Sequence, residues 1–182
     1  MARFPALSLV LAALLAASGF PAAADVTDPD APRSLPAEGP VDVQWTDPAQ
    51  FSEIRLSRNR FEARRGDWVH DLARYLRERA ARRLSPGQRL DVTITDIERA
   101  GEFEPGMRTS SVRFMRDVYP PRIALDFTLT GADGAVLATG SRELTDIGYL
   151  QGRPRAFDND PLRYEKQLID DWLRREFATP AG

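Results

Sequence analysis

An alternating run of residues between positions 122 and 145 constrains the fold more than any other feature. Large apolar side chains occupy every second position from Ile123 to Leu129, with small or polar residues between them. A period of two is typical of a strand with one buried and one solvated face. Residues 131–134, Gly-Ala-Asp-Gly, supply glycines that can adopt the positive φ angle of a short turn. A second strand over 135–144 would therefore close an antiparallel hairpin.

Two segments have the spacing of amphipathic helices instead. Residues 67–84 repeat apolar side chains four apart after Asp67, which is a suitable N-cap, and Ser-Pro-Gly follows as a stop. Residues 160–177 begin with Asp160 and a proline at the first helical position, then carry an apolar stripe. We expect both helices to pack on the same face of the sheet. The arginines along the first helix fit a solvated face better than a polyanion site.

Three further strands complete the predicted sheet. Alternation begins at Val41 and again at Leu90, and a third strand begins at Val112. A strand, a helix and a strand in this order favour a parallel crossover. We therefore predict an α+β fold over residues 41–178: a two-layer sandwich in which a mixed, mostly antiparallel sheet of about five strands carries two helices on one face. With 182 residues, the chain is long enough for one such domain.

The N-terminus has the order of a secretory signal peptide. Arg3 precedes an apolar run over 7–17, and Ala22 and Ala24 form an Ala-x-Ala cleavage motif. We predict a signal peptide over residues 1–24 and a periplasmic location. The run is shorter than the roughly 18 to 20 apolar residues that span a bilayer, so no stable membrane anchor is expected after cleavage.

The segments that flank the domain are expected to lack a core of their own. Residues 25–40 contain four prolines among scattered acidic residues, which predicts an extended tether. Residues 179–182 are expected to be a frayed tail.

Composition disfavours several classes of chemistry. The chain has no cysteine and one histidine, His70, so thiolate and multi-histidine metal sites are not expected. No glycine-rich phosphate loop follows a strand, and a formal net charge of −2 gives no general attraction to nucleic acid. We accordingly predict no cofactor, no metal and no nucleic-acid partner.

Two groups of polar residues remain as candidate sites. Asp96, Glu98 and Glu102 follow the second strand, and a carboxylate pair there could catalyse glycoside hydrolysis or bind a divalent cation. Such acids are also ordinary solubilising residues at the end of a strand.

The second group surrounds a double proline and consists of Arg113, Asp117, Tyr119 and Arg122. In a strand that is regular to Tyr119, the first three share one face, which could bind an anionic or peptide ligand. The alternative is that these residues hold the corner together.

The chain also resembles a known family. The segments that carry the resemblance are Val-Gln-Trp-Thr-Asp-Pro (43–48), Asp-Val-Tyr-Pro-Pro-Arg-Ile (117–123), Leu-Thr-Gly-Ala-Asp-Gly (129–134) and Asp-Pro-Leu-Arg-Tyr-Glu-Lys (160–166). They are similar to secreted proteobacterial proteins grouped as domain of unknown function 3016. The resemblance implies export and a domain from Val41 to about Phe177, but it assigns no activity and no functional residue.

These observations favour a non-enzymatic binding or accessory module of the cell envelope. It would present its open sheet face or its Tyr-Pro-Pro corner to an envelope protein or to an anionic or peptide ligand. The alternative is a carboxylate-dependent hydrolase of an envelope glycan that uses Asp96 with Glu98 or Glu102.

Overall fold

The computed structural model describes residues 24–104, 106, 111–151 and 159–177. Ala22, most of the expected signal peptide and the expected tail lie outside these residues. Four strands form the main sheet in the order β1-β2-β5-β6: β1 (Val41–Trp45), β2 (Arg89–Glu98), β5 (Arg122–Thr130) and β6 (Val136–Thr145). A separate two-stranded sheet pairs β3 (Glu102–Phe103) with β4 (Arg113–Phe114).

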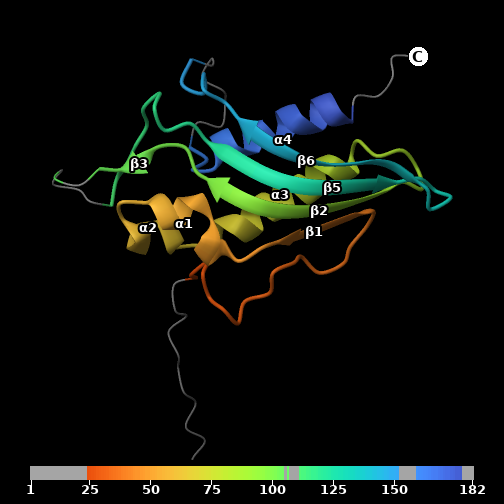
Figure 1. Cartoon of the computed structure of the whole chain (residues 1–182), viewed down its shortest axis with the longest axis horizontal. Helices are drawn as coiled ribbons and strands as arrows, with labels where there is room; N and C mark the ends of the chain where they lie inside the picture. The colour runs from red at the N-terminus through yellow and green to blue at the C-terminus, as the bar shows by residue number, and fades with distance from the viewer. Residues whose placement is uncertain (1–23, 105, 107–110, 152–158, 178–182) are drawn as a thin grey trace, which may run out of the picture.

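The helices complete the second layer and one end of the molecule. They are α1 (Ser52–Leu56), α2 (Arg60–Arg64), α3 (Trp68–Ala81) and α4 (Arg163–Glu176), and a single 3-10 turn, η1 (Pro48–Gln50), precedes α1. α3 and α4 lie together on one face of the sheet, whereas α1 and α2 lie beside the end of β2 (Figure 1). This arrangement confirms the predicted α+β sandwich.

The register confirms the expected strand directions. β1 runs parallel to β2, while β2 and β6 are both antiparallel to β5. Gly134, with φ +79°, provides the positive φ in the turn between β5 and β6. Side chains that alternate along β5, including Leu125 and Phe127, are buried against the helices, where Phe127 contacts the Trp172 ring edge-on at a centroid distance of 5.7 Å.

The strand expected to start near Val112 does not join the main sheet. It ends at Phe114 and pairs only with β3. The chain then turns, with the Tyr119 amide donating to the Arg116 carbonyl at 2.9 Å, and the two following prolines are buried. Because proline has no N–H to donate to a ladder, this corner interrupts strand pairing until β5 begins at Arg122.

The segment 25–40 differs from the free tether that its proline content predicts. Val26 and Leu35 are buried, at 9% and 7% exposure. The Leu35 amide donates to the Val43 carbonyl and the Trp45 amide donates to the Arg33 carbonyl, at 2.9 and 2.8 Å. The segment also turns near residues 25–31, where the Asp28 amide donates to the Asp25 carbonyl and the Ala31 amide to the Asp28 carbonyl. The open edge of β1 offers this segment hydrogen bonds, and the core accepts its two apolar side chains.

The helix expected to start at Pro161 begins two residues later, at Arg163. Asp160 still stabilises this end, because its carboxylate accepts from the Leu162 amide at 2.8 Å and from Lys166 Nζ at 2.6 Å. None of the helices among the described residues has the length and apolar character needed to cross a bilayer.

Candidate functional site

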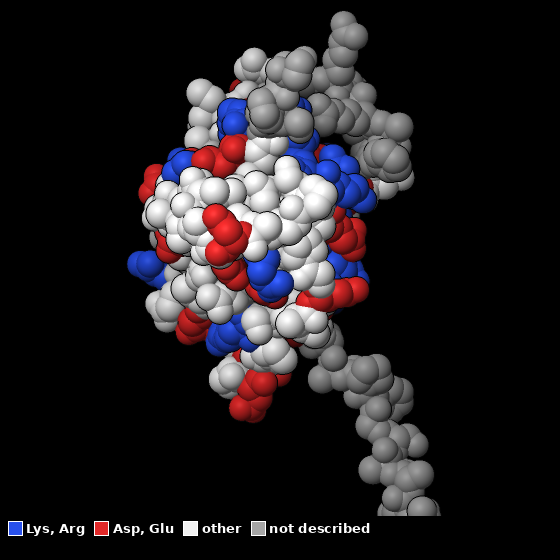
Figure 2. Space-filling model, turned by 90° about the vertical axis from the view of Figure 1, so that its right-hand side faces the viewer, with Lys and Arg blue, Asp and Glu red and all other residues white. Residues whose placement is uncertain are grey.

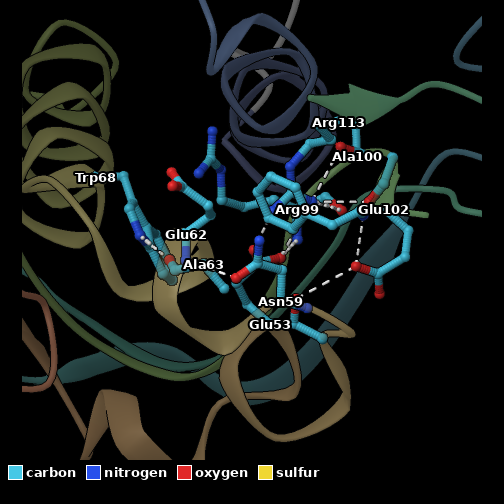
Figure 3. Close-up of polar contacts among 12 residues, drawn as sticks. Glu53, Asn59, Glu62, Ala63, Trp68, Arg99, Ala100, Glu102 and Arg113 are labelled. Carbon is cyan, nitrogen blue, oxygen red and sulfur yellow. Dashed lines mark hydrogen bonds and ion pairs between the residues drawn. The ribbon is translucent and has the colours of Figure 1, made fainter. Parts of the chain in front are cut away.

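Four charged side chains converge where α1, the end of β2, β4 and α4 meet. Glu53 comes from α1, Arg99 follows β2, Arg113 lies on β4 and Glu165 lies on α4. Figure 3 shows Glu53, Arg99 and Arg113 directed toward one another. We call this group the buried charge cluster; it contains two acids and two arginines.

The pair Glu53 and Arg113 forms one half of the cluster. Their side chains are only 3% and 12% exposed, and Arg113 donates to both carboxylate oxygens of Glu53. The same guanidinium donates to the Gly101 carbonyl at 2.7 Å and lies 4.6 Å from the centroid of the Phe103 ring. Arg113 therefore fastens the β3–β4 sheet to α1.

Glu165 and Arg99 form the other half. Glu165 is 1% exposed, and its Oε1 accepts from the Ala100 amide at 2.7 Å, while Oε2 has no hydrogen-bond partner among the described residues. The Arg99 amide donates to Glu53 at 3.0 Å, and its guanidinium lies over the Trp68 ring at 5.6 Å. The residues that follow β2 are thus held by acids from two different helices.

Burial is the main influence on ionisation in this cluster. It raises the pKa of both Glu53 and Glu165, although Arg113 and Arg99 act in the opposite direction. Burial also lowers the pKa of Arg99, and nearby Arg113 lowers it further. Removing charges from water is costly unless they are paired and hydrogen-bonded. The two acids of the cluster are therefore stabilised by its two arginines, and the reverse. The arrangement fits a structural joint.

The predicted carboxylates lie near one another at the end of β2. Both oxygens of Asp96 accept from Ser52, one from its amide and one from its hydroxyl, each at 2.6 Å. Asp96 therefore caps the start of α1. Glu102 accepts from the Ser57 hydroxyl at 3.3 Å and from the Phe103 amide at 2.7 Å.

Glu98 is the least constrained of the three acids. Asp96 and Glu98 flank the buried Ile97 and so lie on the same face of β2. The Arg122 Nε lies 3.6 Å from a carboxylate oxygen of Glu98. Burial raises the pKa of Glu98; Arg122 lowers it, and Asp96 and Glu102 raise it. Among the described residues, no group of three or more potential ligands is placed to bind a metal ion.

The four residues predicted around the double proline do not share one face. Arg113 points inward to Glu53, and the Tyr119 hydroxyl donates to Glu104 at 3.5 Å. Asp117 is exposed, and the Arg122 side chain is 62% exposed. The expectation of a common face depended on a regular strand to Tyr119, and β4 ends at Phe114. Arg113 and Tyr119 thus hold the corner, which is the alternative that the sequence left open.

Of the buried charge cluster, the sequence singled out only Arg113; it missed Arg99 and both acids. One signal for Glu165 was present, because it lies on the apolar stripe of its helix between Leu162 and Leu168. Glu53 is similarly placed between two apolar anchors, Phe51 and Ile54. An acid at a core position of an amphipathic pattern indicates a buried partner of opposite charge.

The sheet face opposite α3 and α4 is lined by small polar and charged side chains. Figure 1 shows this face toward the viewer, with α1 reaching it near the end of β2. Its outward residues on β1, β2, β5 and β6 include Asp42, Gln44, Asp91, Thr93, Asp126, Thr128, Thr139, Ser141 and Glu143.

Hydrogen bonds link several of these side chains across the strands. Gln44 donates to the Thr93 hydroxyl at 2.9 Å, and the hydroxyls of Thr128 and Thr139 are 3.2 Å apart. A hollow of ≈ 230 Å³ lies on this side, between residues 34–35 and the first two strands. We call this surface the open sheet face.

The fold and the contacts define an α+β domain with a four-stranded main sheet, a small second sheet, a buried ionic joint and an open polar sheet face. The comparison with known families agrees with the resemblance seen in the sequence. The chain belongs to the family described as protein of unknown function (DUF3016), whose model matches residues 39–175. A search of curated proteins gave no match.

Proposed function

We propose that this protein is exported to the periplasm and acts as a non-enzymatic binding or accessory module of the cell envelope. The observation that carries this proposal is the open sheet face, which is broad and lacks the helical layer of the opposite face. The two helices fill the other side of the sheet, which disfavours a carrier with a roomy apolar pocket.

The charge of the open sheet face suggests a basic partner. Acids on it include Asp42, Asp91, Asp126 and Glu143. Its arginines Arg89 and Arg122 are paired with Asp42 and Glu98, at 2.8 and 3.6 Å. The remaining carboxylates lie among hydroxyl groups that can donate and accept hydrogen bonds. A segment of an envelope protein rich in lysine or arginine would complement this surface. Of the two arginines predicted to bind an anionic ligand, Arg113 is already bonded to Glu53 and Arg122 pairs with Glu98.

A defined peptide series tests the binding surface. The full chain is titrated with a lysine-rich peptide and with an acidic peptide of equal length, and thermal unfolding is followed. A peptide at about 100 times its dissociation constant adds about 2.7 kcal/mol of stability. We expect the basic peptide alone to stabilise the protein, and D91N/D126N to remove that effect.

The matched control is E38Q/E78Q, which removes the same charge from exposed positions outside the open sheet face. If both double variants lost the stabilisation equally, the effect would come from the overall charge of the protein and not from the open sheet face. Stabilisation by the acidic peptide alone would contradict the assignment to this face. Export is checked separately: the periplasmic form should have the mass of a chain that starts at Asp25.

A carboxylate-dependent hydrolase remains the second candidate. Its support is the raised pKa of Glu98 beside Asp96, which is the pattern of an acid with a charged neighbour. Both oxygens of Asp96 are bonded to Ser52, however, which leaves this carboxylate poorly placed as a base. Glycan fragments are incubated with the wild type and with E98Q. Hydrolysis that disappears in E98Q, with folding intact, would favour the enzyme over the binding module.

A further inference from the structure

A second exposed surface lies on α1, α2 and the residues that join and follow them. Its members are all exposed, and we call it the α1–α2 patch: Arg55, Leu56, Arg58, Arg60, Phe61, Arg64 and Arg65. Leu56 and Phe61 are 62% and 60% exposed, so neither belongs to the core. Five arginines and two large apolar side chains therefore face solvent on two very short helices.

Much of the positive charge in this patch is uncompensated. Arg64 pairs with Asp25 at 3.3 Å, and Arg65 pairs with Glu62 at 3.0 Å. Arg55, Arg58 and Arg60 form no ion pair within the described part of the chain. The formal charge of the whole protein is −2, so this excess is local. At the opposite end of the molecule, acidic and basic side chains are interspersed (Figure 2).

The apolar members of the patch lie among its charges. The guanidinium carbons of Arg64 and Arg65 lie 5.8 and 5.9 Å from the centroid of the Phe61 ring. Arg60 donates to the Arg55 carbonyl at 3.0 Å, which joins α2 to α1. Exposed apolar tips surrounded by cations suit the boundary between lipid headgroups and acyl chains, where rings are buried and arginines meet phosphates.

The first described residues of the chain are attached to the end of α2. The Gly66 amide donates to the Ala24 carbonyl at 2.7 Å, and the Val26 amide donates to the Arg64 carbonyl at 3.0 Å. The residues on either side of the predicted cleavage site, from Ala24 to Val26, therefore lie directly beside the patch.

We infer that the α1–α2 patch docks reversibly on the surface of a bilayer that contains anionic lipid. The arginines contribute attraction to headgroup phosphates, and Leu56 and Phe61 enter the interface. This surface is separate from the open sheet face and has the opposite charge, so either assignment can fail without the other. An acidic protein would match the charge as well, but the exposed Leu56 and Phe61 among the arginines favour a lipid interface.

Vesicle binding by the full chain tests this inference. Partition coefficients are measured on vesicles of phosphatidylcholine alone and of phosphatidylcholine with phosphatidylglycerol. The ratio of the two coefficients is the readout, because the N-terminal run is present in every variant and can bind both membranes. Each arginine near an anionic surface strengthens binding by about fivefold. We expect R55Q/R58Q/R60Q to reduce the ratio by about 100-fold, and high salt to reduce the wild-type ratio.

Two controls make the result specific. R74Q/R82Q/R83Q removes three charges from α3 and the turn that follows it, and should keep the wild-type ratio. F61S should weaken partitioning onto anionic vesicles while leaving its salt dependence in place. An unchanged ratio in the patch variant, or an equal fall in the α3 variant, would overturn the inference. Binding of a glutamate-rich peptide with no preference for anionic vesicles would identify an acidic protein instead.

Discussion

The buried charge cluster and the α1–α2 patch use the same residue type in opposite ways. Arg113 is 12% exposed and bonded to Glu53, whereas Arg55 is exposed and lacks an ion pair among the described residues. Glu53 and Arg55 belong to the same short helix, which turns one inward and the other outward. A buried arginine that pairs with a carboxylate, such as Arg113, has a structural role. An exposed arginine without such a pair, such as Arg55, stays available to a partner.

The largest expected difference between the two regions is in stability. Arg113→Ala leaves Glu53 buried without its counter-charge, and breaking a buried pair in this way costs about 3 to 5 kcal/mol. The free energy of unfolding in urea should fall by that amount. Loss of the β3–β4 contacts to α1 should be visible as faster amide hydrogen exchange in these strands.

Arg122→Ala is the matched change at a surface pair. Arg122 lies 3.6 Å from Glu98 and its side chain is 62% exposed. Exposed ion pairs contribute about 0 to 1 kcal/mol, so this variant should be nearly as stable as the wild type. Similar losses in Arg113→Ala and Arg122→Ala would remove the distinction between buried and exposed arginines.

The sheet and the main helices could be predicted because each repeats one pattern many times. Alternation along residues 122–144 and the four-residue spacing in 67–84 both report which side chains meet the core. Residues 25–40 and the strand near Val112 were less predictable, because each is placed by a partner far along the chain. Residues 25–40 are held by hydrogen bonds to the edge of β1. The strand near Val112 pairs with β3 and ends before the proline corner.

The candidate site was harder to predict from the sequence than the fold. Asp96 and Glu98 are close together as expected, but their bonds to Ser52 and Arg122 arise from tertiary contacts. The Glu53–Arg113 pair is separated by 60 positions, and no short motif contains both residues. Charge pairs of this kind become visible only when the elements that carry them are brought together.

A smaller difference between the two regions is expected in how the free energy of unfolding depends on pH. Burial raises the pKa of Glu165 above its ordinary value of 4.5. The folded protein therefore keeps a proton that the unfolded chain has released, so stability falls as pH rises. The contribution of Glu165 is fully present below about pH 4.5 and is lost as pH rises through its folded pKa.

Glu165→Gln removes this titration while keeping an oxygen for the Ala100 amide. In urea unfolding between pH 4 and 8, its stability should fall less with pH than that of the wild type, with the slope from Glu53 still present. Glu78→Gln, on the exposed face of α3, should keep the wild-type slope. If Glu165→Gln kept the full slope as well, ionisation of Glu165 would not be linked to folding.

The smallest expected effect belongs to the α1–α2 patch itself. R55Q/R58Q/R60Q removes exposed charges that have no ion pair among the described residues, and such surface changes usually alter stability by no more than about 0.5 kcal/mol each. Relief of repulsion among neighbouring arginines acts in the stabilising direction and offsets the lost hydrogen bond from Arg60 to the Arg55 carbonyl. Urea unfolding at low and high salt should therefore give a triple variant at least as stable as the wild type, with the difference shrinking as salt screens the charges. A loss of several kcal/mol would mean that these arginines hold the domain together as Arg113 does. Their exposure would then no longer indicate a surface kept for a partner.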